Sequence, residues 1–324
     1  MTDILNYYGV ESVPLAVKFI IFQFLIIVPF IAGYRMKTLL DDPPAVSKKV
    51  IRVNLMLLEP PVIFWSIWGL QIRHEMAVLP VAGLCIVIAG FVLGKLSLPL
   101  LRLKGAARKT FLISASLANH GFTMGGFICY LFMKETGLAL SSIFIMYFMP
   151  YTFLVIFSYA QAGTGKFTLR SARDFILSYR NMPLFAALAA LLLLATEIPR
   201  PRLDPPVDLV MMLSVVFYYW TLGLSHDLRE GIALRRGHVA LAAIKFLLVP
   251  AAAFLALQWA PIGRDIKSVI QIQSFMPAAI YSVVTAILFD LDARLASSLF
   301  VVNTVMFILI VLPVMFALHC AGLF

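Results

Sequence analysis

The chain has 324 residues, of which 62% are hydrophobic and only 13% are charged. A soluble domain is about 45–50% apolar and about 25% charged, so this composition excludes a soluble globular protein. The net charge of +10 does not indicate nucleic acid, because the basic residues lie in short segments between long apolar runs, where they report membrane topology. The sequence therefore predicts a lipid bilayer as partner and no nucleic acid.

A succession of apolar segments fills almost the whole chain. A helix needs about 20 mostly apolar residues to cross the hydrocarbon core of a bilayer. We expect such helices at 14–34, 50–70, 76–101, 111–133, 138–161, 182–198, 207–224, 239–260, 266–289 and 295–320. The pattern predicts an all-α membrane protein with ten transmembrane helices.

The basic residues predict the orientation of these helices. The loops after the first, third, fifth, seventh and ninth predicted helices hold most of the 26 Lys and Arg residues. Cytoplasmic loops are the ones enriched in positive charge. We therefore expect an integral protein of the plasma (cytoplasmic) membrane with both termini outside.

The middle of the chain divides the predicted helices five and five. The polar stretch 162–181 separates a first repeat at 1–161 from a second at 182–324. An odd number of helices per half forces the second half to insert inverted, an arrangement typical of many transporters. Two similar segments favour a repeat: Lys134-Glu-Thr-Gly-Leu-Ala-Leu-Ser-Ser and Asp290-Leu-Asp-Ala-Arg-Leu-Ala-Ser-Ser. The alternative is a chance similarity between apolar segments.

The fourth predicted helix contains polar residues and glycines near its middle, namely Asn119, His120, Gly121, Gly125 and Gly126. Glycine lowers helix stability by about 1 kcal/mol per residue. In lipid, an unwound segment persists only where it is buried in protein or lines a wet cavity. The sequence favours an interrupted helix that forms a binding site. The alternative is close helix packing through Gly121 and Gly125.

The ninth predicted helix contains Pro277, which has no amide hydrogen and frees the carbonyl of Gln273. Polar side chains surround it, which favours a second interrupted helix over a plain proline kink. Helix starts at such breaks offer free amides and a positive dipole end to an anion. The candidate substrate-binding residues are Asn119, His120, Gly121, Gly125, Gly126, Gln273, Ser274, Met276, Pro277 and Tyr281.

Ionisable residues inside the spans are candidates for a coupling site. Glu59 lies well inside the second predicted helix, where it can exchange a proton or hold a sodium ion, or be a structural, hydrogen-bonded residue. Gln271 and Ser116 are further candidates to hold a coupling Na⁺ or H⁺. Lys95 and Lys245 lie close to cytoplasmic helix ends, so we expect their long side chains to reach toward the interface.

The sequence gives no indication of an enzyme or of a cofactor. It contains no glycine-rich phosphate loop, no HExxH and no Gly-x-Ser-x-Gly nucleophile motif. Cys85, Cys129 and Cys320 lie inside apolar segments without metal-ligand spacing. We therefore expect no catalytic residues and no metal site.

The order and spacing of several short motifs resemble the auxin efflux carrier family, which includes plant auxin exporters and bacterial carboxylate permeases. The matching motifs are Asn119-His-Gly121-Phe122 followed by Gly125-Gly126; Met182-Pro183-Leu184, Ile198-Pro199 and Leu222-Gly223-Leu224; and Met276-Pro277-Ala278, Asp292, Leu295-Ala296-Ser297-Ser298, Thr304 and Pro313. The resemblance spans nearly the whole chain. Glu59 is not part of the family pattern.

The resemblance implies a fold related to bile acid/sodium symporters, with a scaffold part, a crossover part and a site where helices four and nine cross. It implies a secondary transporter or uniporter of a small organic carboxylate, carried by elevator-like motion, and a homodimer through the scaffold. Two alternatives stay open. One is a sodium- or proton-coupled carrier of a lipophilic or sterol-like cargo, and the other is a carrier fold that acts as a ligand sensor.

Overall fold

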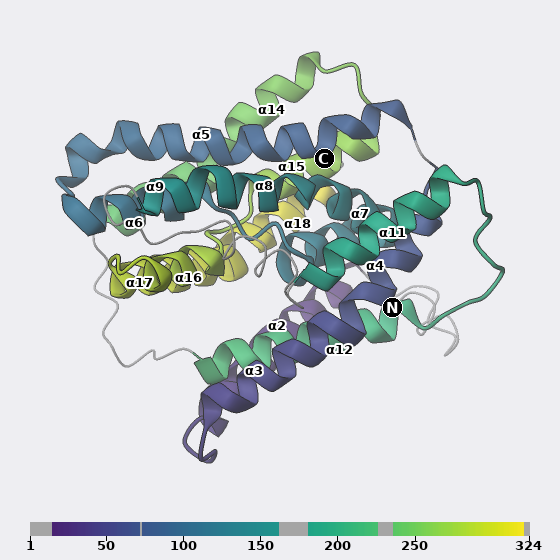
Figure 1. Ribbon diagram of the computed structural model, residues 1–324, viewed down its shortest axis with the longest axis horizontal. Coiled ribbons are helices and arrows are strands. Elements are labelled where there is room, and N and C mark those ends of the chain that lie inside the picture. Colours follow the sequence, from purple (N-terminus) through teal and green to yellow (C-terminus); the bar gives the residue numbers. More distant parts are fainter. Residues whose placement is uncertain (1–14, 72, 162–180, 226–235, 321–324) are drawn as a thin grey trace. The chain divides into compact units, whose positions relative to one another are not determined.

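The computed structural model describes residues 15–71, 73–161, 181–225 and 236–320 (Figure 1). Every regular element within these residues is helical, and no β-strand forms among them. The predicted all-α class is therefore confirmed.

Six helical stretches in the described part are long and apolar enough to cross a membrane: Pro43–Trp68, His74–Leu101, Met124–Gln161, Val207–Leu224, Arg236–Trp259 and Ala293–Leu318. Two shorter apolar helices lie at Gln23–Met36 and Met182–Ala195. These stretches indicate an integral membrane protein. The count of ten spans and the inverted repeat stay predictions.

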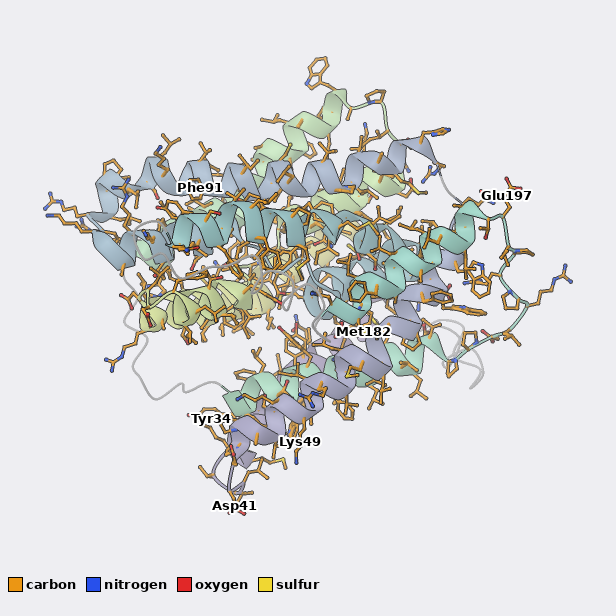
Figure 2. All side chains as sticks on the ribbon, in the orientation of Figure 1. Tyr34, Asp41, Lys49, Phe91, Met182 and Glu197 are labelled. Atoms are coloured by element: carbon orange, nitrogen blue, oxygen red, sulfur yellow. The ribbon has the colours of Figure 1, made fainter. Side chains whose placement is uncertain are left out.

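Large apolar side chains cover the outer faces of the helices (Figure 2). Leu96 and Leu154, for example, are 69% and 74% exposed. Of the charged residues labelled in Figure 2, Asp41 and Glu197 lie between helices, and Lys49 lies within the helix Pro43–Val53. An apolar surface of this kind is favourable in contact with lipid and unfavourable in contact with water.

The helices form two compact units. The first comprises Met1–Gly69, Tyr179–Glu230 and Met315–Phe324, and the second comprises Leu70–Ser178 and Gly231–Val314. Each unit takes segments from both halves of the chain. The repeats predicted at 1–161 and 182–324 divide the sequence into two halves, which is a different division from the two compact units, and they stay a prediction. The linker predicted at 162–181 lies, apart from Asn181, outside the described residues.

The first unit contains α2 (Leu15–Met36), α3 (Pro43–Val53), the π-helix η1 (Asn54–Leu58), α4 (Glu59–Trp68), α11 (Met182–Ala195) and α12 (Val207–Ser225). Helix α12 packs along α2 and α3, and α11 packs along α4. Gly33 lies against the carbonyl of Trp220, and Gly223 lies against the carbonyl of Phe30. The backbones of α2 and α12 therefore approach each other directly, which small residues permit.

The second unit is formed by η2 (His74–Ala77), α5 (Val78–Leu101), α6 (Gly105–Ser116), η3 (Phe122–Gly126), α7 (Phe127–Phe144), η4 (Ile145–Tyr147), α8 (Phe148–Tyr151), η5 (Thr152–Phe157), α9 (Ser158–Gln161), α13 (Arg236–Ala243), η7 (Ile244–Leu248), α14 (Val249–Trp259), α15 (Arg264–Ser274), α16 (Ile280–Leu288), α17 (Ala293–Met306) and η8 (Phe307–Val311). Element η8 leads into α18 (Leu312–Cys320), which ends in the first unit.

A single residue bends α7 where the sequence predicts a boundary between two helices. Lys134 has φ 57° and ψ −146°, which is not helical. A positive φ is uncommon for a residue with a side chain. The 38-residue stretch Met124–Gln161 is longer than the roughly 20 residues of one span, and Lys134 divides it close to the predicted boundary at 133–138.

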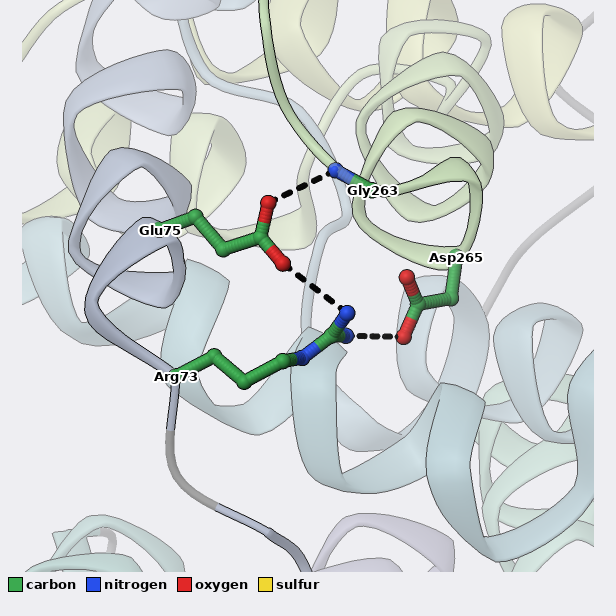
Figure 3. A network of polar contacts seen from close by, with 4 residues as sticks. All are labelled: Arg73, Glu75, Gly263 and Asp265. Carbon is green, nitrogen blue, oxygen red and sulfur yellow. Dashed lines mark hydrogen bonds and ion pairs between the residues drawn. The ribbon is translucent and has the colours of Figure 1, made fainter.

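A polar cluster fixes the start of α15 (Figure 3). Arg73 pairs with Asp265 and, through Nη1, with Glu75 Oε1 at 2.9 Å. The amide of Gly263 donates to Glu75 Oε2 at 2.7 Å. The turn before α5 therefore holds the first turn of α15, the first half of the ninth predicted helix.

Candidate functional site

The fourth predicted helix is interrupted after α6, which ends at Ser116. The next helical residue is Phe122, where η3 begins. Leu117 (ψ 130°) and Gly121 (ψ 172°) are extended. The interruption coincides with Asn119 and the first of the glycines, where helix propensity is lowest.

The ninth predicted helix is interrupted in the same way. Helix α15 ends at Ser274, α16 begins at Ile280, and Ala279 is extended with ψ 146°. Pro277 lies between them and cannot donate the hydrogen bond that would continue the helix. The ninth predicted helix is therefore interrupted, and the alternative, a continuous helix with a proline kink, does not occur.

The two interruptions cross each other through their backbones. Residues Ala118 and Ala278 form an isolated antiparallel bridge. Its hydrogen bonds run from Asn119 N to Pro277 O at 2.8 Å and from Ala279 N to Leu117 O at 3.1 Å. The buried amide of Ala278 donates to Asn303 Oδ1 at 2.8 Å. Buried peptide groups need such partners, so the bridge makes both breaks stable inside an apolar span.

Lys245 caps the end of α6, and this corrects the expectation that it reaches toward the interface. Its side chain is only 2% exposed. Nζ donates to the carbonyl oxygens of Ser116 and Leu117, each at 3.1 Å. Helix C-termini carry partial negative charge, so the ammonium group finds both hydrogen-bond acceptors and a favourable dipole there. Lys95, in contrast, is exposed as expected.

His120 lies in the first break and connects it to α15 and η4. Its Nε2 lies 3.0 Å from the carbonyl oxygen of Gln273, and its Nδ1 lies 2.5 Å from the hydroxyl of Tyr147. A carbonyl only accepts, so Nε2 carries the proton of this contact. Both ring nitrogens are engaged in the structure, and His120 is 1% exposed.

The three predicted glycines have different surroundings. A Cβ on Gly125 would overlap the side-chain oxygen of Gln273 and lie 2.8 Å from the backbone of His120. A Cβ on Gly126 would meet Ser141 Oγ at 3.3 Å. Gly121 has room for a Cβ, which would meet only Ile145 Cδ1, at an ordinary contact distance of 3.8 Å. Gly125 and Gly126 thus permit close packing, while Gly121 leaves room for a methyl group.

Asn119 carries the least occupied donor at the crossing. Its Nδ2 contacts only Met124 Sδ, at 3.7 Å, and thioether sulfur is a weak acceptor. Asn119 is buried, with 7% of its surface exposed. The first amides of η3 and α16 have no acceptor within their own helices. The bridge between Ala118 and Ala278 joins the two breaks in which these donors lie.

The remaining predicted substrate residues lie at the same crossing. Gln273 donates weakly to His120 O at 3.5 Å, and its Oε1 has no partner in the described part. Met276 and Pro277 are buried in packing, and the ring of Tyr281 packs edge-on against Phe148 at 5.0 Å. Ser274 donates to Gln271 O at 2.6 Å.

The three coupling candidates do not share one unit. Ser116 donates to Val87 O at 2.9 Å and contacts the hydroxyl of Tyr151 at 2.7 Å. Gln271 Nε2 donates to Pro250 O at 3.3 Å. Both belong to the second unit, whereas Glu59 belongs to the first.

Sequence reasoning missed Asn303 and Tyr147 and gave Lys245 a different role. Asn303 interrupts the apolar run Phe300-Val-Val-Asn303, which is a detectable signal. Lys245 also has apolar neighbours on both sides, in Ile244-Lys-Phe-Leu-Leu248. Tyr147 carries no such signal. Among the described residues, no group of three or more His, Cys, Asp or Glu is placed to hold a metal ion.

Residues 221–315 match the family model of membrane transport proteins. That family includes auxin efflux carriers, as the resemblance of the motifs indicates. The matched segment contains the second interrupted helix, Lys245 and Asn303. No curated protein matches the chain significantly. The match supports a membrane transporter.

Proposed function

We propose that the protein is a secondary transporter or uniporter of a small organic carboxylate, which binds where the two interrupted helices cross. The observation that carries the proposal is the bridge between Ala118 and Ala278, which joins the two breaks beside the side-chain amide of Asn119, a donor that has only the weak acceptor Met124 Sδ.

The chemistry of this crossing suits an anion. The helices that start at Phe122 and Ile280 offer a positive dipole end and first amides that have no acceptor within their own helices. Asn119 Nδ2 would donate to one carboxylate oxygen, and Gln273 and Tyr281 would complete the pocket. Lys245 adds a positive charge to the same region while it holds the carbonyls of α6. His120, Gly125 and Gly126 would position these groups.

The transport cycle would be alternating access by elevator-like movement of the crossover domain, here the second unit, against a scaffold formed by the first. A homodimer would form through the first unit, and Na⁺ or H⁺ would be the coupling ion. The protein would lie in the plasma membrane with both termini outside. The match of residues 221–315 supports transport as such.

The test is uptake of labelled mono- and dicarboxylates into liposomes that contain the purified protein, with a sodium gradient, a proton gradient or neither. We expect saturable uptake that Asn119→Ala abolishes. Gln258→Ala, which removes an exposed amide from α14 of the same unit, is the matched control and should transport normally.

Wild-type uptake by a folded Asn119→Ala protein would remove Asn119 from the site. If no carboxylate moves under any gradient, a lipophilic cargo becomes the next candidate, and binding without flux would indicate a sensor.

A further inference from the structure

A polar cluster lies inside the first unit, where α4 follows a π-helix. Asn54 begins η1 and Glu59 begins α4, and their side chains are 2% and 3% exposed. Pro60 and Pro61 follow at once. Prolines cannot donate to the preceding turn, which disturbs the regular hydrogen bonding here. The irregular turn brings Asn54 Nδ2 to 3.3 Å from Glu59 Oε1.

This cluster contains more hydrogen-bond acceptors than donors, so some of its buried oxygens have no donor. Asn54 Nδ2 has two protons and donates to Glu59 Oε1 and, at 3.1 Å, to the carbonyl of Ser214. Asn54 Oδ1 and Ser214 Oγ are buried without a partner in the described part. Glu59 Oε2 makes no hydrogen bond to any described residue. The hydroxyl of Ser214 can supply only one of the missing donors.

No positive side chain in the described part compensates Glu59. Helices α3, α11 and α12 pack against η1 and α4. Their titratable groups are Lys48, Lys49 and Arg52 on α3 and Asp208, Tyr218 and Tyr219 on α12, while α11 has none. None of these groups bonds to Glu59, whose one hydrogen bond is to Asn54. A buried, unpaired carboxylate is strongly unfavourable.

We propose that Glu59, Asn54 and Ser214 form a binding site for one monovalent cation, a proton or a sodium ion, within the first unit. A proton on Glu59 would supply the missing donor to one of the unpaired oxygens. A sodium ion would take the same carboxylate, amide and hydroxyl oxygens as ligands, since hard cations prefer oxygen. The site goes beyond the proposed function, because it holds for any cargo and is tested with the ions alone.

The first measurement is infrared spectroscopy of the purified full-length protein during a pH titration, which detects a protonated carboxyl group directly. The second is equilibrium binding of radioactive sodium, with choline as the replacement cation. The variant Glu59→Gln keeps the shape and removes the charge. Glu197→Gln is the control, because Glu197 is an exposed carboxylate of the same unit.

A proton site predicts a carboxyl band that titrates in the wild type and in Glu197→Gln and is lost in Glu59→Gln. A sodium site predicts saturable binding of one ion, with the same pattern of loss. Where Glu59→Gln does not fold, Ser214→Ala carries the test, since it should shift the midpoint of the pH or sodium titration. The proposal is overturned if neither the carboxyl band nor sodium binding depends on Glu59 or Ser214.

Discussion

Glu59 in the first unit and Lys245 in the second are both buried inside apolar spans, but their surroundings differ. Lys245 has two backbone carbonyls as acceptors at the end of α6. Glu59 has one donor, the Asn54 amide, next to oxygens that have none. A buried lysine whose donors bond to the free carbonyls at a helix C-terminus stabilises the fold. A buried carboxyl group among unpaired acceptors is instead suited to an exchangeable ion.

The largest expected effect is at Lys245. Lys245→Met removes the side-chain donor to the carbonyls of Ser116 and Leu117. The Ala279 amide still donates to Leu117 O, but Ser116 O loses its donor, which should lower the free energy of unfolding by about 1–3 kcal/mol. Denaturant titration in detergent measures it.

Lys95→Met is the matched control, because Lys95 is exposed in α5 of the same unit. A surface change of this kind should stay within about 0.5 kcal/mol. Equal stabilities of the two variants would show that Lys245 does not hold the crossing, and the contrast with Glu59 would disappear.

Two glycines of the first break differ in how much room they leave for a methyl group, so they separate an effect on packing from an effect on the proposed carboxylate site. Gly125→Ala places a methyl group against Gln273 and the backbone of His120, so it should destabilise by about 1–3 kcal/mol. Gly121→Ala has room and a φ of −65° that alanine tolerates. It should fold like the wild type and lose carboxylate uptake. Thermal unfolding together with liposome uptake distinguishes the two, and the reverse order of stabilities would contradict the geometry.

A smaller effect tests the other buried charge. Asn54→Ala removes the donor to Glu59 and to the Ser214 carbonyl, and should destabilise by about 1–2 kcal/mol. Ser66→Ala is the control, since Ser66 Oγ has no partner in the described part and lies on the buried side of α4. If Ser66→Ala destabilises as much as Asn54→Ala, the hydrogen bonds of Asn54 do not stabilise the unit.

The smallest effect is expected at the partly exposed cluster of Figure 3. Asp265→Asn removes one carboxylate from Arg73, which keeps Glu75, so the loss should be about 0–1 kcal/mol. The loss should shrink further in high salt, because exposed pairs are screened. The Lys245→Met effect should not change with salt. A salt-dependent Lys245→Met effect would mean that Lys245 is hydrated and not buried.

The sequence predicted the breaks because their causes are local. Glycine near Asn119 and proline at 277 act on their own backbone, so composition shows where each helix ends. Lys245 was misjudged because its partners, the carbonyls of Ser116 and Leu117, are far away in the chain. The position of Lys245 near a helix end suggested that its side chain reaches the membrane interface. The contact between η7 and the end of α6 forms only in the folded protein.

The grouping of helices was also beyond the sequence. Helix α12 packs on α2, and α15 packs on α7, across more than a hundred residues of chain. Hydrophobicity reports that a helix is in lipid, but it does not name the neighbour. Asn54 was missed for the same reason, because its second acceptor is the Ser214 carbonyl on α12.

The bridge between Ala118 and Ala278 has a mechanical consequence. Its hydrogen bonds use main-chain atoms of the two breaks, so a displacement of α6 and η3 is transmitted to α15 and α16 without any particular side chain. The crossed segments would therefore travel as one body during any conformational change. Because alanines form this joint, the surrounding side chains are free to diverge, and a new cargo preference can evolve without loosening it.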